Sequence, residues 1–298
     1  MTRVLCFGSL NIDYVYKVKH IARVGETIFS SERNVFSGGK GLNQSVALGK
    51  AGAEVYHAGC AGSDGQFLLE ILRNAGVDTG FIHVLPEQLT GHAIIQNDRD
   101  GNNCIVIHSG ANQLITEEDI DHTLSHFAAG DYLVLQNEIN NIPYIIKQAS
   151  AKEMKIVLNP SPLNEDIQRV ALSGVDLLFV NEIEASEITG KGQDDIDGMI
   201  DALKRIGKTV LTLGDKGAVY IEDKKTVYQQ IYKVKAVDTT AAGDTFTGYF
   251  LAGILRGDSA EAALDMAAKA AAITVSGRGA APSIPTMEQV AAFHGDLQ

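Results

Sequence analysis

The chain has 298 residues, of which 45% are hydrophobic and 21% are charged, as expected for a globular protein with a sizeable core. The formal net charge of −12 and the lack of a basic stripe argue against nucleic acid as a partner. No apolar run reaches the ~18 residues needed to span a bilayer, and the first residues lack a secretory signal pattern, so we expect a cytoplasmic protein without membrane contact.

Short apolar runs alternate with helical patterns along the chain. In chain order, strands are predicted at residues 4–8, 55–60, 132–136, 156–159, 177–180 and 210–213. Helices are predicted at residues 42–51, 66–75, 142–150, 196–206, 245–255 and 260–275. This alternation predicts an α/β fold with a mostly parallel central sheet and helices on both faces, in one domain spanning residues 1–298. Ligands of such sheets bind beyond the carboxyl ends of the strands.

Two stretches, at about residues 13–36 and 90–108, interrupt this alternation. The first has alternating residues such as Tyr14, and the second has two β-like runs around an Asp100-Gly101 turn signal. We interpret both stretches as strands that leave the main sheet and form a small β lid. A thin sheet with apolar residues on both faces cannot bury them alone, so we predict a homodimer formed through the lid.

The strongest chemical signal is the segment DTTAAGDTF at residues 238–246. It places small residues at the start of an amphipathic helix and a carboxylate, Asp244, in its first turn. Small side chains let a phosphate approach free backbone N–H groups, and the helix dipole favours its negative charge. An acid there can take the proton of a hydroxyl that attacks phosphorus. The alternative is an ordinary helix cap by Asp244.

Two loops near the N-terminus carry groups suited to a sugar. In the segment SGGKGLNQ at residues 37–44, glycines permit close approach of the backbone, and Lys40 and Asn43 can donate to hydroxyls. This is not a Walker A loop, because a glycine follows Lys40. Asn11 and Asp13 are two residues apart in an extended segment, so they face the same way and can receive vicinal hydroxyls. The alternatives are a flexible turn with a solvated lysine and a simple polar turn.

Three further signals follow predicted strands. Asn181 and Glu184 could supply oxygens near Mg²⁺, although an acid-rich helix start would look the same. The segment TLGDKGA at residues 212–218 could hold the ribose and phosphates of a nucleotide. It could equally be a hairpin turn, which the segment alone favours. Glu138 also follows a strand and by itself is unremarkable.

The histidines and cysteines point to no metal or disulfide framework. His122 and His126 have the spacing of a metal pair but no HExxH context, and an exposed helical face explains them better. Cys6, Cys60 and Cys104 form no CxxC pair, which predicts free, buried thiols.

Together the motifs resemble the ribokinase family of carbohydrate kinases. The resemblance covers nearly the whole chain, with GSLNID from residue 8, SGGKGLNQSVALGKAGA from residue 37, NEIEASEITG from residue 181, TLGDKGA from residue 212, DTTAAGDTFTG from residue 238 and GRGAAPSIP from residue 277. A GGKG segment followed closely by Asn and later by DTxxAGD is very specific, whereas each motif alone is weak. The chain departs from the family at Ala241, which replaces a frequent glycine.

The resemblance implies a role for each matching residue. Asp244 removes the proton of the sugar's primary hydroxyl, and the N–H groups of Ala242, Gly243 and Asp244 form an anion hole for the phosphoryl group. The residues implied to hold the sugar are Asn11, Asp13, Gly39, Lys40, Asn43, Glu138 and Asp244. Those implied to face ATP are Asn181, Thr212, Leu213, Gly214, Asp215, Lys216, Gly217, Gly243 and Ala268, the last where a relative has a histidine near the adenine. Glu184 is implied to organise Mg²⁺ through water, and a potassium ion is implied beside Asp238, Thr240, Thr274, Gly277, Gly279 and Ser283.

The activity implied by the resemblance is an ATP-dependent sugar kinase. It would transfer the γ-phosphoryl of ATP to the primary hydroxyl of a free pentose, with D-ribose giving D-ribose 5-phosphate, and would use Mg²⁺ and K⁺. The alternatives are a kinase for deoxyribose, a nucleoside or another sugar, and a non-catalytic sugar sensor. Asn11 with Asp13 favours a sugar with vicinal hydroxyls, and an intact Asp244 argues against a sensor.

Overall fold

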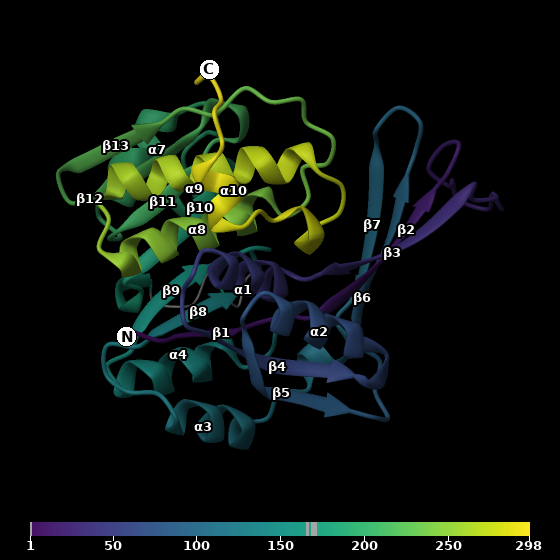
Figure 1. Cartoon of the computed structure of the whole chain (residues 1–298), viewed down its shortest axis with the longest axis horizontal. Coiled ribbons are helices and arrows are strands. Elements are labelled where there is room, and N and C mark those ends of the chain that lie inside the picture. Colours follow the sequence, from purple (N-terminus) through teal and green to yellow (C-terminus); the bar gives the residue numbers. More distant parts are fainter. Residues whose placement is uncertain (1, 165–166, 168–171) are drawn as a thin grey trace.

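Two β-sheets organise the chain in the computed structural model, which describes residues 2–164, 167 and 172–298 (Figure 1). The larger sheet has the strand order β13-β12-β11-β10-β9-β8-β1-β4-β5 in the described part of the chain. All pairings from β11 to β5 are parallel, whereas β12 and β13 are antiparallel additions at one edge. The strands of this sheet are β1 Val4–Phe7, β4 Val55–Gly62, β5 Asp78–Leu85, β8 Tyr132–Gln136, β9 Lys155–Asn159, β10 Leu177–Asn181, β11 Thr209–Thr212, β12 Ala218–Glu222 and β13 Lys225–Gln229.

Helices cover both faces of this sheet, which confirms the predicted α/β architecture. One face packs against α1 Lys40–Lys50, α2 Gln66–Asn74, α8 Ala242–Arg256, α9 Ala260–Ser276 and α10 Met287–Ala291. The other face packs against α3 Glu117–Ser125, α4 Ile142–Ala151, α6 Glu182–Thr189 and α7 Ile196–Leu203. Side chains alternate along each strand, so Val4 and Cys6 of β1 enter the first core while Leu5 and Phe7 enter the second. The apolar runs in the sequence reflect burial on both faces.

The second sheet is the predicted lid, and it projects from the body of the molecule (Figure 1). Its strands are β2 Asn11–Lys17, β3 Glu32–Gly38, β6 Gly91–Asn97 and β7 Asn103–His108, in the order β3-β2-β6-β7. The hairpin between β6 and β7 is present as predicted, and Gly101 in its turn has a φ of 87°, which favours glycine. The lid begins at Asn11, two residues earlier than expected.

Several details differ from the sequence-based expectation. The helix α8 begins at Ala242 rather than at residue 245, because the small residues of the DTTAAGD segment already form its first turn. Strand β5 was not predicted, since it lies at a sheet edge and lacks a continuous apolar run. Cys6 and Cys60 are buried free thiols, as expected, but Cys104 is exposed. The prediction was wrong for Cys104 because β7 is an edge strand whose residues are all exposed.

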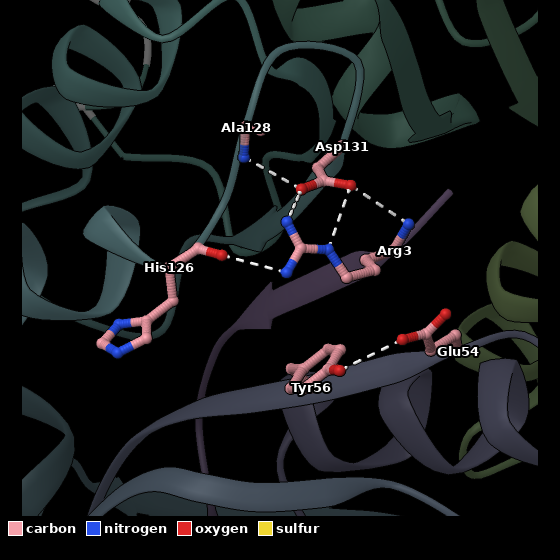
Figure 2. Close-up of polar contacts among 6 residues, drawn as sticks. All are labelled: Arg3, Glu54, Tyr56, His126, Ala128 and Asp131. Carbon is pink, nitrogen blue, oxygen red and sulfur yellow. Dashed lines mark hydrogen bonds and ion pairs between the residues drawn. The ribbon is translucent and has the colours of Figure 1, made fainter. Parts of the chain in front are cut away.

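A charged cluster holds the amino end of β1 in place (Figure 2). The backbone N–H and the guanidinium of Arg3 both donate to the Asp131 carboxylate, and Arg3 Nη1 donates to the carbonyl of His126 at 3.0 Å. The N–H of Ala128 also donates to Asp131, at 2.9 Å. Burial alone would raise the pKa of Asp131, but these hydrogen bonds outweigh it and lower the pKa. The cluster lies at the opposite end of β1 from the lid, so it is structural.

No helix among the described residues has the length and apolar character needed to cross a membrane.

Candidate active site

Three adjoining cavities follow the carboxyl ends of the parallel strands. We call them the outer cavity, of about 540 Å³, the central cavity, of about 230 Å³, and the lid cavity, of about 780 Å³. Asn181, Thr212 and Gly243 line both the outer and the central cavity, and Lys40 and Asp244 line both the central and the lid cavity. The three therefore form one continuous cleft, at the edge of the sheet where the topology places ligands.

The start of α8 lies where the three cavities meet. Ala241 precedes the helix with a φ of 62°, in the left-handed region, and its carbonyl accepts from the N–H of Thr245 at 2.8 Å. An alanine in this conformation costs about 1–2 kcal/mol relative to a glycine, so the turn is retained despite strain. Among the described residues, the N–H groups of Gly243 and Asp244 have no backbone partner, while that of Ala242 donates to Thr239 at 3.3 Å. Two N–H donors at a helix N-terminus are therefore available for an anion.

The Asp244 carboxylate is buried between the central and lid cavities. Its Oδ2 accepts from Asn43 Nδ2 at 3.0 Å, and its Oδ1 accepts from Gln44 Nε2 at 3.0 Å. Only 8% of the residue is exposed, which excludes bulk water from most of it. A carboxylate held in this way, next to free N–H groups, can accept a proton from a hydroxyl that enters from the lid cavity.

Asn11 and Asp13, from the first lid strand, both line the lid cavity, as their spacing predicted. The Asp13 carboxylate lies against the backbone of Gly38, where a Cβ would come within 2.3 Å of Asp13 Oδ2. Burial raises the pKa of Asp13 from 3.8 to about 6, with a smaller contribution from the charge of Glu138. A half-buried carboxylate with a raised pKa, which accepts no hydrogen bond from the described residues, is suited to accept hydrogen bonds from a ligand.

A hydrogen bond between Lys40 and Glu138 links the start of α1 to the residues that follow β8. Glu138 Oε2 accepts from the N–H of Lys40 at 2.9 Å and from the Ser9 hydroxyl. Burial raises the pKa of Glu138, although the positive charge of Lys40 opposes it. Burial alone would lower the pKa of Lys40, but the carboxylates of Asp244, Glu138 and Glu184 outweigh it and raise the pKa. Gly39, just before Lys40, has a φ of 92°, which requires glycine at this position.

Asn181 and Glu184 line the central cavity and cap the start of α6. Asn181 Oδ1 accepts from the N–H of Glu184 at 2.8 Å, and Glu184 Oε2 accepts from the N–H of Asn181 at 3.0 Å. Asn181 and Glu184 therefore form an acid-rich helix start and also face the central cavity. No cluster of three His, Cys, Asp or Glu side chains suited to a metal occurs among the described residues. One carboxylate beside amide oxygens fits Mg²⁺ that keeps most of its waters and binds mainly to phosphates.

The loop after β11 is both a hairpin and part of a cavity wall. Strands β11 and β12 are antiparallel, so the hairpin interpretation is correct, and Thr212, Gly214, Asp215 and Gly217 line the outer cavity. Ala268 of α9 lines the same cavity. Among the described residues, Leu213 and Lys216 are not in the cavity wall, and Leu213 is buried in the core instead.

The residues implied to hold a monovalent cation come from the segment just before α8 and from the segment after α9, which meet at Asp238 and Gly279. The Asp238 carboxylate accepts from the N–H and hydroxyl of Thr240, at 3.0 and 2.6 Å, and from the N–H of Gly279 at 3.0 Å. The N–H of Gly277 donates to the carbonyl of Thr274, and a Cβ at Gly277 would lie 2.8 Å from that of Ser283. This set of carbonyl oxygens, hydroxyls and one carboxylate fits a hard cation.

Four residues that line the cleft or bind its side chains were missed by sequence reasoning. Gln44 donates to Asp244, and Asn112 donates to Asn11 Oδ1 at 2.8 Å. Ser9 donates to Glu138, and Arg278 lines the lid cavity. Ser9, Gln44 and Arg278 lie inside segments that the sequence analysis had singled out. Their roles depend on contacts between segments far apart in the chain, which spacing alone does not reveal.

The comparisons with known proteins agree with this geometry. The profile described as pfkB family carbohydrate kinase matches residues 1–287. The ribokinase of Staphylococcus aureus is 36% identical over 300 residues, covering 97% of this chain and 98% of the relative. The ribokinase of Haemophilus influenzae is 34% identical over 295 residues, covering 96% of each chain.

Solved structures give the same result. The structure of Arabidopsis thaliana ribokinase complexed with ribose and ATP has a TM-score of 0.86 at 27% identity, covering 98% of this chain and 99% of that one. Similarity over nearly the whole length extends to the strands, helices and loops that form the cleft. The chain belongs to the pfkB family of carbohydrate kinases.

Proposed function

We propose that this sugar kinase transfers the γ-phosphoryl group of ATP to the primary hydroxyl of D-ribose and forms D-ribose 5-phosphate. The observation that carries the proposal is the position of Asp244, a buried carboxylate between two cavities and beside unpaired N–H groups of α8. Asn11 and Asp13 line the sugar side of that position. The names of the similar ribokinases support ribose as the sugar.

In the proposed mechanism, ribose occupies the lid cavity and the nucleotide occupies the outer cavity. Asp13 and Asn11 accept hydrogen bonds from vicinal hydroxyls, while Lys40, Asn43, Gly39 and Glu138 complete the sugar site. Asp244 accepts the proton of the primary hydroxyl as its oxygen attacks the γ-phosphorus. The N–H groups of Gly243 and Asp244 donate to the phosphoryl oxygens, where the dipole of α8 favours negative charge. Closure of the lid over the cleft would exclude water, which would otherwise hydrolyse ATP.

Two metal ions belong to the proposal. Asn181 and Glu184 would position Mg²⁺ through water, and the ion would neutralise charge on the phosphates. Asp238, Thr240, Thr274, Gly277, Gly279 and Ser283 would hold K⁺. Because Asp238 and Thr240 lead directly into α8, an ion there would orient the turn that carries the N–H donors.

Measurement of ADP release over a panel of sugars tests the function. We expect D-ribose to be the best substrate, with a kcat/KM at least about tenfold above that of 2-deoxyribose, because the deoxy sugar leaves one buried acceptor unpaired. A preference for deoxyribose or a nucleoside would identify a related kinase instead. Binding of ribose without ADP release would identify a sugar sensor.

Potassium should activate the enzyme more than sodium does. The proposed ligands, the Asp238 carboxylate and carbonyl oxygens of the segment at residues 277–283, suit a large cation. The ion would act on the anion-hole turn without touching substrate. We expect initial rates in saturating ribose and ATP to be highest in potassium chloride, lower in sodium chloride and lowest in tetramethylammonium chloride at equal ionic strength. Equal rates in all three salts would remove the cation from the proposal.

We propose that two copies of the chain associate through the outer face of the lid. Alternate residues of the lid strands, such as Ile95, Ile105 and Ile107, line the lid cavity. The intervening residues Ile94 and Val106 lie on the opposite face, where they are 43% and 62% exposed. An apolar face on a thin projecting sheet is typical of an interface.

Light scattering at micromolar concentration should therefore give the mass of a dimer. Val106→Asp places a charge on the proposed interface and should yield a monomer, with a dissociation constant raised at least about tenfold. Val84→Asp is the matched control, since Val84 is an exposed valine on β5, outside the lid, and this change should leave the dimer intact. A wild-type protein that is only monomeric would contradict the proposal.

A cytoplasmic location is also proposed. It is supported by the three free cysteines, one of them exposed, and by a substrate, ATP, that is abundant inside cells.

A further inference from the structure

The Asp244 carboxylate is the end of a buried chain of amide side chains that reaches across the core. Gln44 of α1 donates from Nε2 to Asp244 Oδ1 at 3.0 Å. Gln136, the last residue of β8, donates from Nε2 to Gln44 Oε1 at 2.6 Å. Gln44 and Gln136 are 0% and 1% exposed, and neither is among the described residues that line the three cavities. Gln44 Nε2 also lies 3.4 Å from Asn159 Oδ1, so these amides can influence the reaction through Asp244 and, by this longer contact, through Asn159, which lines the central cavity.

The direction of this chain is fixed by charge. If the Gln44 amide were reversed, its oxygen would face the carboxylate of Asp244, and its nitrogen would face the nitrogen of Gln136. Both contacts would be repulsive. With the observed orientation, each amide donates toward Asp244, and the negative charge strengthens the first hydrogen bond. The orientation of Gln136 thus determines which end of the Gln44 amide meets Asp244.

Gln136 keeps this orientation at a cost to its own hydrogen bonding. Among the described residues, its Oε1 has no hydrogen-bond partner although it is buried. An unpaired buried oxygen is unfavourable, and such groups call for a specific explanation. A Cβ at Gly8 would lie 2.4 Å from this oxygen, so the absence of a side chain there makes room for the amide. The need for a donor facing Gln44 explains why the arrangement persists.

Close packing of two helices brings Gln44 within reach of Asp244. Helices α1 and α8 meet at Gly248, where a Cβ would lie 2.4 Å from that of Ala47. The contact holds residues 43 and 44 of α1 beside the first turn of α8, and Asn43 donates to the second oxygen of Asp244. Both carboxylate oxygens are thereby held by donors from one helix, which restricts the rotation of the carboxylate.

We propose that Gln44 is a positioning residue for Asp244 and that Gln136 fixes the orientation of the Gln44 amide. The inference rests on the proposed role of Asp244 as the base. Gln44 holds the carboxylate so that it is aimed at the primary hydroxyl. Because Gln44 does not reach the cavities, it contributes to the rate and leaves substrate binding unchanged.

Steady-state kinetics of Gln44→Met test this inference. Methionine has a similar length and no donor, so we expect kcat to fall roughly tenfold to a hundredfold while the KM values for ribose and ATP stay within about twofold. Loss of the donor leaves the carboxylate free to turn away from the hydroxyl, so the effect should appear in kcat and not in the KM values. Both substrates are saturating when kcat is measured.

Other charged groups near Asp244 are unchanged by this substitution. Lys40 of α1, Glu138 after β8 and Glu184 of α6 act on the same buried region, and Arg278 shares the lid cavity with Asp244. Burial raises the pKa of the Cys6 thiol of β1 to about 11, so it stays neutral at the pH of the assay. A fall in kcat is therefore attributable to the lost donor.

Three further variants separate positioning from a structural effect. Ser45→Ala is the matched control, since Ser45 follows Gln44 on α1 and the change breaks its buried hydrogen bond to His57 of β4. It should leave kcat within about twofold. Gln136→Met keeps Gln44 but removes the hydrogen bond that fixes the orientation of the Gln44 amide. It should lower kcat by about three- to tenfold. In the Asp244→Asn background, Gln44→Met should have no further effect on kcat, because residues acting through one group are not additive.

Each outcome decides the inference. If Asp244→Asn lowers kcat but neither Gln44→Met nor Gln136→Met does, the positioning role is wrong while the base assignment stands. If Asp244→Asn itself keeps its kcat, the proposed function of Asp244 fails first. If Gln44→Met does not fold, the result for Gln136→Met decides, and an unchanged kcat in that folded variant overturns the inference.

Discussion

Asp244→Asn is expected to lower kcat by roughly 10²–10⁴, the usual contribution of a positioned general base. Asparagine has almost the same shape and can accept one hydrogen bond, so ribose and ATP should still bind. The first turn of α8 should also persist, because asparagine is tolerated near helix starts. The variant keeps the Gly243 N–H donor for the phosphoryl group but cannot take the proton.

The measurement is kcat at saturating substrates, together with the circular dichroism spectrum and the ribose affinity of the variant. Asp215→Asn is a matched control, since Asp215 lines the outer cavity in the hairpin loop and is proposed to contact only the nucleotide. It should raise the KM for ATP more than it lowers kcat. A folded Asp244→Asn protein that binds ribose and retains near-native kcat would falsify the assignment of the base.

Asp13→Ala is expected to weaken ribose binding by ~2–4 kcal/mol, which corresponds to about 30- to 1,000-fold in affinity. The carboxylate is half-buried at the wall of the lid cavity, where two hydroxyl hydrogen bonds would replace its lost hydration. The effect should appear in the ribose KM and leave the ATP KM nearly unchanged. An unchanged ribose KM would show that the sugar lies elsewhere in the cleft.

The pH dependence of Asp13 gives an independent check. Its pKa of about 6 in the folded protein lies above its ordinary 3.8, so the ionised form is disfavoured by folding. The ligand-free protein should thus be destabilised by this group as pH rises from about 4 to 6, by up to ~3 kcal/mol for a shift of about two units. Asp13→Asn should therefore unfold at a higher temperature than wild type at pH 8. Below about pH 4, where the group is protonated in both states, the difference should vanish.

Ribose affinity should follow the opposite trend. Hydroxyl groups of the sugar donate to the ionised carboxylate, so the affinity of the wild-type protein should decrease as pH falls through 6. The affinity of Asp13→Asn should be low and nearly independent of pH in this range. Destabilisation of the empty site and strong binding of the ligand have the same origin, a half-buried carboxylate without a hydrogen-bond partner among the described residues.

Glu138 has two proposed roles, one in holding a loop and one in binding the sugar, and a single substitution would affect both. Glu138 accepts from the N–H of Lys40 and from Ser9, so it holds the loop before α1 as well as facing the lid cavity. A change at Glu138 would act on both loop geometry and sugar binding. Asp13, which lies on the lid strand β2, gives the cleaner test of the sugar site.

The sequence by itself determined the fold class and the segments that form the cleft. Alternating apolar runs predicted the strands of the central sheet, because burial on both faces leaves a continuous apolar run that is visible locally. The DTTAAGD segment predicted a helix start with Asp244 in its first turn, since small residues followed by an amphipathic pattern are a local signal. The Asp100-Gly101 turn predicted the lid hairpin for the same reason.

Only the tertiary structure decided how these segments cooperate. Gln44 and Gln136 are ninety-two residues apart in sequence, and their hydrogen bond exists because α1 packs against strand β8 of the central sheet. Likewise, the loop at residues 212–218 gave two local interpretations, and it is both a hairpin and a cavity wall because β11 ends beside α8. The pKa of Asp13 depends on burial by the neighbouring β3 and on the charge of Glu138. Sequence patterns record the burial and turns of each segment, whereas charge, hydrogen bonding and exclusion of water depend on distances between segments that only the folded chain sets.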